Sequence, residues 1–168
     1  MKLTMYAMST ELLANALNNL SHVLGKGLEF ATQKKIDPAV LLAARLAPDM
    51  FPLTRQVQIA CDIAKNSVAR LAGQEPKRFE DNETTFEQLR ARIAACIDYM
   101  KSIPASALEG AESRDIKVPA GPGRTHEFKG LEMLQTWAIP HVLFHVTTAY
   151  AILRHNGVEI GKRDFIGR

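Results

Sequence analysis

Four stretches of the chain repeat apolar residues every three or four positions, and this spacing constrains the fold more than any other feature of the sequence. It matches the period of an α-helix with one buried face. Four such helices can bury their apolar faces only against one another. We therefore expect an all-α protein, an antiparallel four-helix bundle that forms one domain over residues 1–168. The stripes run from Leu13 to Ala31, from Val57 to Leu71, from Phe86 to Met100 and from Leu134 to Ile152.

Local signals predict a short extra helix between the first two long helices. Asp37 followed by Pro38 is typical of a helix start, and this short helix is expected to extend through Ala47. Gly25 and Gly27 interrupt the first stripe, and each costs roughly 1 kcal/mol inside a helix. A bend or a break in the first helix is therefore expected near these glycines.

The later helices have equally clear boundaries. Gly73 provides a stop for the second helix. A capping box starts the third helix, formed either by Thr84 with Glu87 or by Thr85 with Gln88. Both pairs precede the third apolar stripe, so either marks the start of a helix.

The part of the chain after Pro104 is rich in turn residues. Residues 116–119 and 125–128 predict a small β-hairpin before the last helix. The fourth long helix is expected over residues 130–155. After it, an extended tail should lie across the bundle, with Phe165 as its anchor.

The composition is ordinary for a soluble globular protein, with 46% hydrophobic and 23% charged residues. The net charge of +3 is mild, the densest basic cluster is short and terminal, and no groove-reading motif supports nucleic-acid binding. No apolar run is long enough to span a membrane, and residues 1–13 lack a secretion signal. We expect a cytoplasmic protein without nucleic-acid or membrane partners, in which Cys61 and Cys96 are reduced core thiols.

His141 and His145 are four residues apart within the apolar stripe of the fourth helix. Residues at this spacing share one side of a helix, so both imidazoles can reach a single point inside the bundle. A buried imidazole without partners costs a few kcal/mol, so a protein group, a water molecule or a metal ion must satisfy the ring nitrogens. Pro140 should bend the helix just before the pair. The spacing leaves a metal site and a pair of hydrogen-bonded core histidines as alternatives. The other histidines are expected to be structural or solvated: His22, His126 and His155.

The segment HVLFHVTTAYAILRHNGV, residues 141–158, resembles the last helix of DinB/YfiT-like proteins. That helix carries H-x-x-x-H, then a small-polar stretch and an L-R-x-x-G-V-like exit. More closely, KIDPAVLLAARLAPDMFPLTRQVQIACDIAK and the ending AYAILRHNGVEIGKRDFIG look like a bacterial family of that superfamily known only as a domain of unknown function. The resemblance covers nearly the whole chain. It implies a DinB-like four-helix bundle that is often a homodimer, and it implies no established activity.

Better-understood members of the superfamily bind a divalent metal through three histidines, two from this motif and one from the second helix. The resemblance implies that His141 and His145 are the two ligands of the last helix. The second-helix histidine matches Gln58, which is followed here too by isoleucine and alanine, and Asp62 one turn later is the stronger ligand chemically. Two histidines and a carboxylate would suit zinc, nickel, iron or manganese, whereas two histidines and an amide would hold a metal weakly.

Two functions follow as hypotheses. The first is a metal-dependent transferase or hydrolase acting on a small molecule, because some superfamily members are thiol transferases or related hydrolases. An open coordination position would then activate water or a thiol. The alternative is a metal-free homodimeric binding or structural module with a degenerate metal site, whose bundle core receives a small-molecule ligand. Gln58 is the feature that favours this alternative.

Three residues are candidates for a general base or an orienting group, by helix position alone. Each also has a plainer interpretation. For Asp62 it is a surface salt bridge, for Tyr150 packing at the edge of the bundle, and for Cys61 a core thiol.

Overall fold

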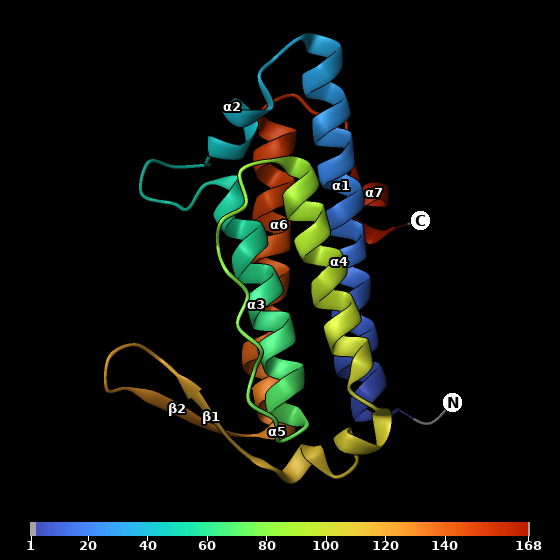
Figure 1. The fold of residues 1–168 in the computed structure, drawn as a ribbon, viewed down its shortest axis with the longest axis vertical. Helices are drawn as coiled ribbons and strands as arrows, with labels where there is room; N and C mark the ends of the chain where they lie inside the picture. Colours follow the sequence, from blue (N-terminus) through green and yellow to red (C-terminus); the bar gives the residue numbers. More distant parts are fainter. Residues whose placement is uncertain (1–2, 168) are drawn as a thin grey trace.

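The structure, a computed structural model, describes residues 3–167, and most of them are helical. Four long helices lie side by side along the molecule (Figure 1). They are α1 (Leu12–Lys34), α3 (Leu53–Leu71), α4 (Phe86–Ser102) and α6 (Ile139–His155). Both α1 and α3 pack against α4 and against α6, so the apolar stripes of all four helices meet in one core. The expectation of a mostly helical chain is confirmed.

The four long helices do not all run antiparallel to the helices they pack against, unlike in the antiparallel bundle that the sequence predicts. In Figure 1, α1 and α6 run one way along the molecule and α3 and α4 run the other way. The packed pairs α1/α4 and α3/α6 are therefore antiparallel, whereas α3/α4 and α1/α6 are parallel. The polar segment 74–85, called the strap below, makes this possible by returning along the helices between the end of α3 and the start of α4. Capping signals mark where a helix ends, and they carry no information on where the next helix begins in space.

Shorter elements complete the chain. Two π-helical segments precede long helices, η1 (Ala7–Glu11) before α1 and η4 (Met133–Ala138) before α6. The other elements are α2 (Pro38–Ala43), the 3-10 helices η2 (Ala105–Leu108) and η3 (Ala111–Ser113), strands β1 (Asp115–Pro119) and β2 (Thr125–Lys129), α5 (Gly130–Glu132) and α7 (Lys162–Ile166). The predicted hairpin is confirmed, since β1 and β2 pair antiparallel with Ile116 opposite Phe128. Its buried residues join a second, smaller apolar cluster around Leu71 and Met133.

Several predicted boundaries can be compared with the structure. The third long helix begins with the capping box of Thr85 and Gln88, one of the two pairs that the sequence offered. The extra helix α2 ends at Ala43 rather than Ala47. The expected extended tail contains a short helix instead, although Phe165 packs against the protein as predicted.

The expected break of the first long helix is wrong, because α1 continues through both glycines. Gly27 is explained by packing: a Cβ atom there would lie 3.0 Å from a methyl carbon of Leu153 and 3.3 Å from the ring of Phe86. Both neighbours are fully buried. Gly27 therefore allows α6 and α4 to approach α1 closely. A Cβ atom at Gly25 would meet nothing closer than the guanidinium of Arg90, at 3.7 Å.

Substitution of the two glycines by alanine should have opposite effects. Gly25→Ala should stabilise the protein by roughly 0.5–1 kcal/mol, because alanine has the higher helix propensity and the added methyl group has room. Gly27→Ala should be destabilising, because the buried Leu153 and Phe86 cannot move away without disturbing the core. Urea unfolding of both variants measures the difference. A Gly27→Ala protein as stable as Gly25→Ala would contradict this account of the packing.

Candidate functional site

The candidate histidines lie directly after a π-helical segment, η4, near the start of α6. Pro140 has no N–H to donate and its ring would clash with the carbonyl of the preceding turn in a regular α-helix. A π-helical turn is wider than an α-helical one and is often found at functional sites. η4 ends two residues before Pro140, and His141 and His145 follow on one side of α6; the predicted bend of the helix stays a prediction.

His145 is held by a side chain from α3. Its Nδ1 atom lies 2.7 Å from Oε1 of Gln56, and the amide nitrogen of Gln56 donates to the carbonyl oxygen of Phe51 at 2.9 Å. Because the amide nitrogen is used by Phe51, the amide oxygen faces His145 and accepts its Nδ1–H. In the neutral ring this leaves a lone pair on Nε2. His145 is only 9% exposed.

His141 is half-buried, and its Nδ1 atom is buried without a hydrogen-bond partner. Its ring packs edge-on against Trp137 with 4.4 Å between the centroids. The rings of His141 and His145 are 6.4 Å apart and tilted by 32°. The structure therefore brings the two predicted ligands together, and it leaves one nitrogen of His141 without a protein partner.

Both imidazoles are held in the neutral form. Burial, with smaller contributions from His141 and Arg55, lowers the pKa of His145 to about 4. Burial also lowers the pKa of His141. Neutral rings have the lone pairs that metal coordination requires, so this electrostatic environment suits ligands better than it suits cations.

Aromatic side chains flank the pair. Trp137 contacts His126 and Phe128 of β2, with ring centroids 5.0 and 5.8 Å apart. On the other side, the ring of Phe144 meets His145 edge-on at 5.1 Å. The hairpin thus contributes one wall beside the histidines. His126 is exposed and packs on Trp137, in agreement with the expectation that it is structural or solvated.

Gln58 points to a different part of the molecule from the histidines. Its amide oxygen accepts from Arg55 at 3.2 Å and its amide nitrogen donates to Glu83 of the strap at 2.9 Å. Residues two apart on a helix differ in direction by about 200°, so Gln56 and Gln58 cannot face the same neighbour. The residue that meets His145 is Gln56, which sequence reasoning missed. The feature of the sequence that could have indicated Gln56 is its position directly before Val57, where the apolar stripe of this helix begins.

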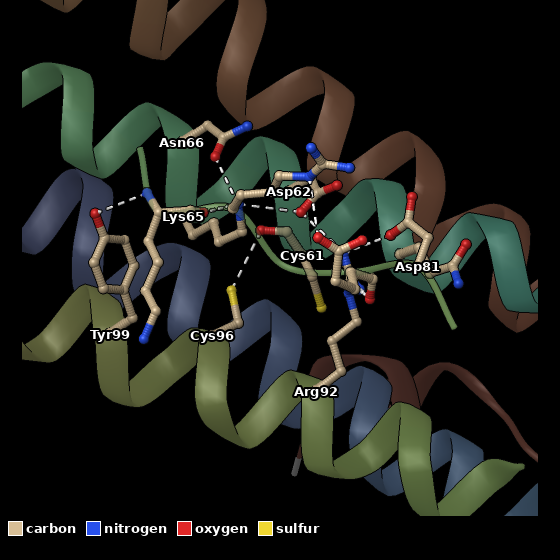
Figure 2. A network of polar contacts seen from close by, with 12 residues as sticks. Cys61, Asp62, Lys65, Asn66, Asp81, Arg92, Cys96 and Tyr99 are labelled. Carbon is tan, nitrogen blue, oxygen red and sulfur yellow. Dashed lines mark hydrogen bonds and ion pairs between the residues drawn. The ribbon is translucent and has the colours of Figure 1, made fainter. Parts of the chain in front are cut away.

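Asp62 belongs to a network of charges that ties the strap to α3 and α4 (Figure 2). The side chain of Arg92 is 2% exposed and binds Asp62, Asp81 and Glu83 at 2.9–3.0 Å. Lys65, 3% exposed, also binds Asp62 at 3.2 Å. Asp62 therefore forms salt bridges, in agreement with its plainer interpretation. Its partners are the two buried cations Arg92 and Lys65. Within residues 3–167, no three His, Cys, Asp or Glu side chains lie close enough together to hold a metal ion.

The two other candidates for a general base, Cys61 and Tyr150, also make contacts that fit their plainer, structural interpretations. The thiol of Cys96 donates to the carbonyl oxygen of Cys61 at 3.3 Å, and both cysteines are free and buried. The neighbouring side chain of Cys96, together with burial, raises the pKa of the Cys61 thiol, which makes it unreactive. The ring of Tyr150 packs edge-on against Phe165 at 5.8 Å. Neither Cys61 nor Tyr150 is placed at the histidines by a hydrogen bond.

The fold and this arrangement can be compared with known proteins. The sequence model of a family described as "Domain of unknown function (DUF1993)" matches residues 5–166. The chain belongs to this family. A crystal structure of a DinB family member from Shewanella denitrificans is similar, with 44% sequence identity and a TM-score of 0.90, and the match covers 97% of this chain and 92% of that one.

The family is thus part of the DinB-like superfamily, and the resemblance drawn from the sequence is confirmed. No curated protein matches the chain. Among the helices of residues 3–167, none is long and apolar enough to cross a membrane.

The lowered pKa of His145 predicts a loss of stability in mild acid. The pKa is about 4 in the folded protein and 6.5 for an ordinary histidine, so the unfolded chain binds the proton more readily between these values. The stabilisation is complete above the unfolded pKa and is lost as the pH falls toward 4. Between about pH 7.5 and pH 5 the free energy of unfolding should fall by roughly 2 kcal/mol through this group. Urea unfolding in a chelating buffer measures it, and His145→Gln should lose that part of the pH dependence.

Removal of the Arg92 guanidinium should weaken the attachment of the strap to α3 and α4 and lower the stability of the protein. Arg92→Met leaves three carboxylates without their shared cation and should cost about 3–5 kcal/mol of stability. Arg90→Met, two residues earlier on the exposed side of α4, is the matched control and should change stability by about 0.5 kcal/mol or less. Equal stability of the two variants would mean that the network contributes nothing to the fold.

Proposed function

We propose that His141 and His145 form a two-ligand site for a divalent transition metal, zinc, nickel, iron or manganese, at which the protein acts as a transferase or hydrolase on a small molecule. The observation that carries this proposal is the hydrogen bond from Nδ1 of His145 to Gln56. Metal-binding histidines nearly always donate their second ring N–H to a carbonyl or carboxylate, which fixes the tautomer and the direction of the ring. Gln56 has this relation to His145.

The donor set supports the proposal in two further respects. Both rings are neutral, and His141 has a ring nitrogen without a protein partner. Two imidazoles on one tetrahedral ion have ring centroids about 5 Å apart, given nitrogen–metal distances near 2 Å. The observed separation is 6.4 Å. Side-chain rotations that move the rings by about 1 Å would therefore suffice.

The protein supplies few other ligands. Gln58 and Asp62 are bound to Arg55, Glu83, Lys65 and Arg92, so two histidines are the ligands that the described residues offer at this point. A site with two protein ligands holds its metal weakly and leaves positions open for water and substrate. When bound, such an ion acts as a Lewis acid that activates water or a thiol. Neutral His141 and His145 hold the ion, Gln56 orients His145, and the aromatic wall around Trp137 limits the access of water.

The engagement of Gln58 and Asp62 favours a second candidate, a metal-free module that binds a small molecule. In that case the lone pair on Nε2 of His145 accepts a hydrogen bond from the ligand. The unpartnered nitrogen of His141 provides a second polar contact, and Trp137 provides an apolar surface.

Metal binding separates the two candidates. Trp137 is the single tryptophan of the chain and lies 4.4 Å from His141, so its fluorescence should report a bound transition metal. Titration of tag-free protein with Co²⁺ or Ni²⁺ should give saturable quenching that is lost in His141→Ala and His145→Ala. Gln56→Met should weaken binding by about 10–100-fold, because His145 loses its orienting partner.

Gln58→Met is the matched control, with the same substitution two residues away on α3, and its metal affinity should equal that of the original protein. Affinities that are insensitive to His145→Ala, or more sensitive to Gln58 than to Gln56, would contradict the proposed site. Protein that binds neither Co²⁺ nor Ni²⁺ and shows an unchanged melting temperature on their addition would favour the metal-free module.

A further inference from the structure

Arg55 is a partly exposed cation on the part of α3 that holds the histidines. It lies one residue before Gln56, whose amide oxygen accepts from Nδ1 of His145. Consecutive residues of a helix differ in direction by about 100°, so Arg55 points between the directions of Gln56 and Gln58. After burial and the charge of His141, the charge of Arg55 is a further cause of the lowered pKa of His145. The guanidinium is therefore within electrostatic reach of this imidazole.

The guanidinium of Arg55 uses only one of its three nitrogens for contacts with the protein. Nη1 donates to Oε1 of Gln58 at 3.2 Å and forms an ion pair with Asp81. Within residues 3–167, no hydrogen bond involves Nε or Nη2 of Arg55, and neither of these two atoms is buried. The N–H groups of Nε and Nη2 form a fork that matches the two oxygens of a carboxylate. Arg55 therefore presents an open two-donor edge, on a side chain that is 39% exposed.

The histidine site has no negative charge that would occupy this edge. No Asp or Glu occurs on the chain between Glu132 and Arg154. In the part of the chain that the structure describes, no carboxylate joins the two histidines in a group of three potential metal ligands. Asp81, the ion-pair partner of Arg55, is shared with Arg92 at 2.9 Å. The positive charge of Arg55 is thus only partly neutralised by the protein.

An exposed aromatic side chain lies on the other side of His145. The ring of Phe144 is 5.1 Å from that of His145, edge-on, and the side chain is 55% exposed. Ligand sites combine apolar surface with a few polar groups that fix the orientation of the ligand. The surroundings of His145 therefore offer a cation with two free donors, a neutral imidazole and an apolar surface.

We propose that Arg55 binds the carboxylate of the small molecule that reaches the histidines, so that the ligands of this site are carboxylates with an apolar body. The open edge of Arg55 donates two parallel hydrogen bonds to the carboxylate. The Nε2 lone pair of His145 faces the body of the molecule, and Phe144 packs against its apolar part. This assignment names the substrate class of the site proposed above and rests on the histidine pair being where a small molecule binds.

Benzoate and benzamide test the assignment, because they have nearly the same shape and only benzoate is charged. Carbon–proton NMR resolves the ring signals of the five histidines, and His145→Gln identifies the signal of His145. In a buffer with EDTA, benzoate should shift this signal in a saturable way. Its affinity should exceed that of benzamide by about 10-fold or more, because two charge-assisted hydrogen bonds are added.

Two substitutions of Arg55 examine the fork and the charge separately. Arg55→Met removes both and should abolish the preference for benzoate over benzamide. Arg55→Lys keeps the positive charge but cannot form the two-donor fork, so benzoate should still bind more weakly than to the original protein. Arg78→Met is the matched control, at an arginine of the strap that is 85% exposed, and it should leave the affinity unchanged.

Asp81→Asn provides a test in the opposite direction. It removes the carboxylate that competes for Arg55, so the affinity for benzoate should rise. Asp98→Asn removes the same charge from an exposed position of α4 and should have no effect. Melting temperatures establish that each variant is folded.

The assignment is overturned if benzoate shifts no signal of His145, or if benzoate and benzamide bind equally. Unchanged affinity in both Arg55 variants, or an equal gain in Asp81→Asn and Asp98→Asn, would also contradict it. The metal titration described above is independent of these results, because the NMR measurements use metal-free protein. Failure to bind Co²⁺ would end the metal-dependent proposal alone, whereas Co²⁺ binding without a response to benzoate would end the carboxylate assignment alone.

Discussion

The packing of α3 against α6 determines the properties of the histidine pair. This antiparallel contact places Gln56 2.7 Å from Nδ1 of His145, and the carbonyl of Phe51 sets the direction of the Gln56 amide. The tautomer of His145 and its free Nε2 lone pair both follow from this one contact. The same contact also buries the ring and lowers its pKa. A shift of α3 by one residue would remove all of these effects together.

The side of α3 that faces the strap and α4 carries a network of charged side chains. Arg92 from α4 binds Asp62 (Figure 2), and Glu83 of the strap accepts a hydrogen bond from Gln58. The buried cations of this network are matched by carboxylates, so the network is balanced and needs no bound ion. Opposite sides of one helix thus have different roles, with Gln56 serving the histidines and Gln58 fastening the strap.

The aromatic residues connect the candidate site with the rest of the surface. Trp137 lies between the hairpin and His141, whereas the ring of Phe144, which is 55% exposed, packs edge-on against His145. Changes in the hairpin would therefore act on the surroundings of His141 through Trp137.

Much of the architecture could be predicted because local physical chemistry determines it. The apolar stripes, the capping box at Thr85 and the turn residues around the hairpin act within a few positions along the chain, and the structure contains the corresponding elements. The register of His141 and His145 on one side of α6 was predictable for the same reason, since helix geometry alone requires it. Membership of the DinB-like superfamily was also readable from the last helix.

What only the tertiary structure decided depends on contacts between distant segments. The parallel course of α3 and α4, the close approach at Gly27, the choice of Gln56 over Gln58 and the capture of Asp62 by Arg92 all involve partners more than 20 residues apart. Periodicity identifies which side of a helix is buried, but the partner of a buried polar group depends on how neighbouring helices are rotated and shifted. The sequence by itself therefore determined the helices and the histidine pair, and helix packing decided which side chain completes the site.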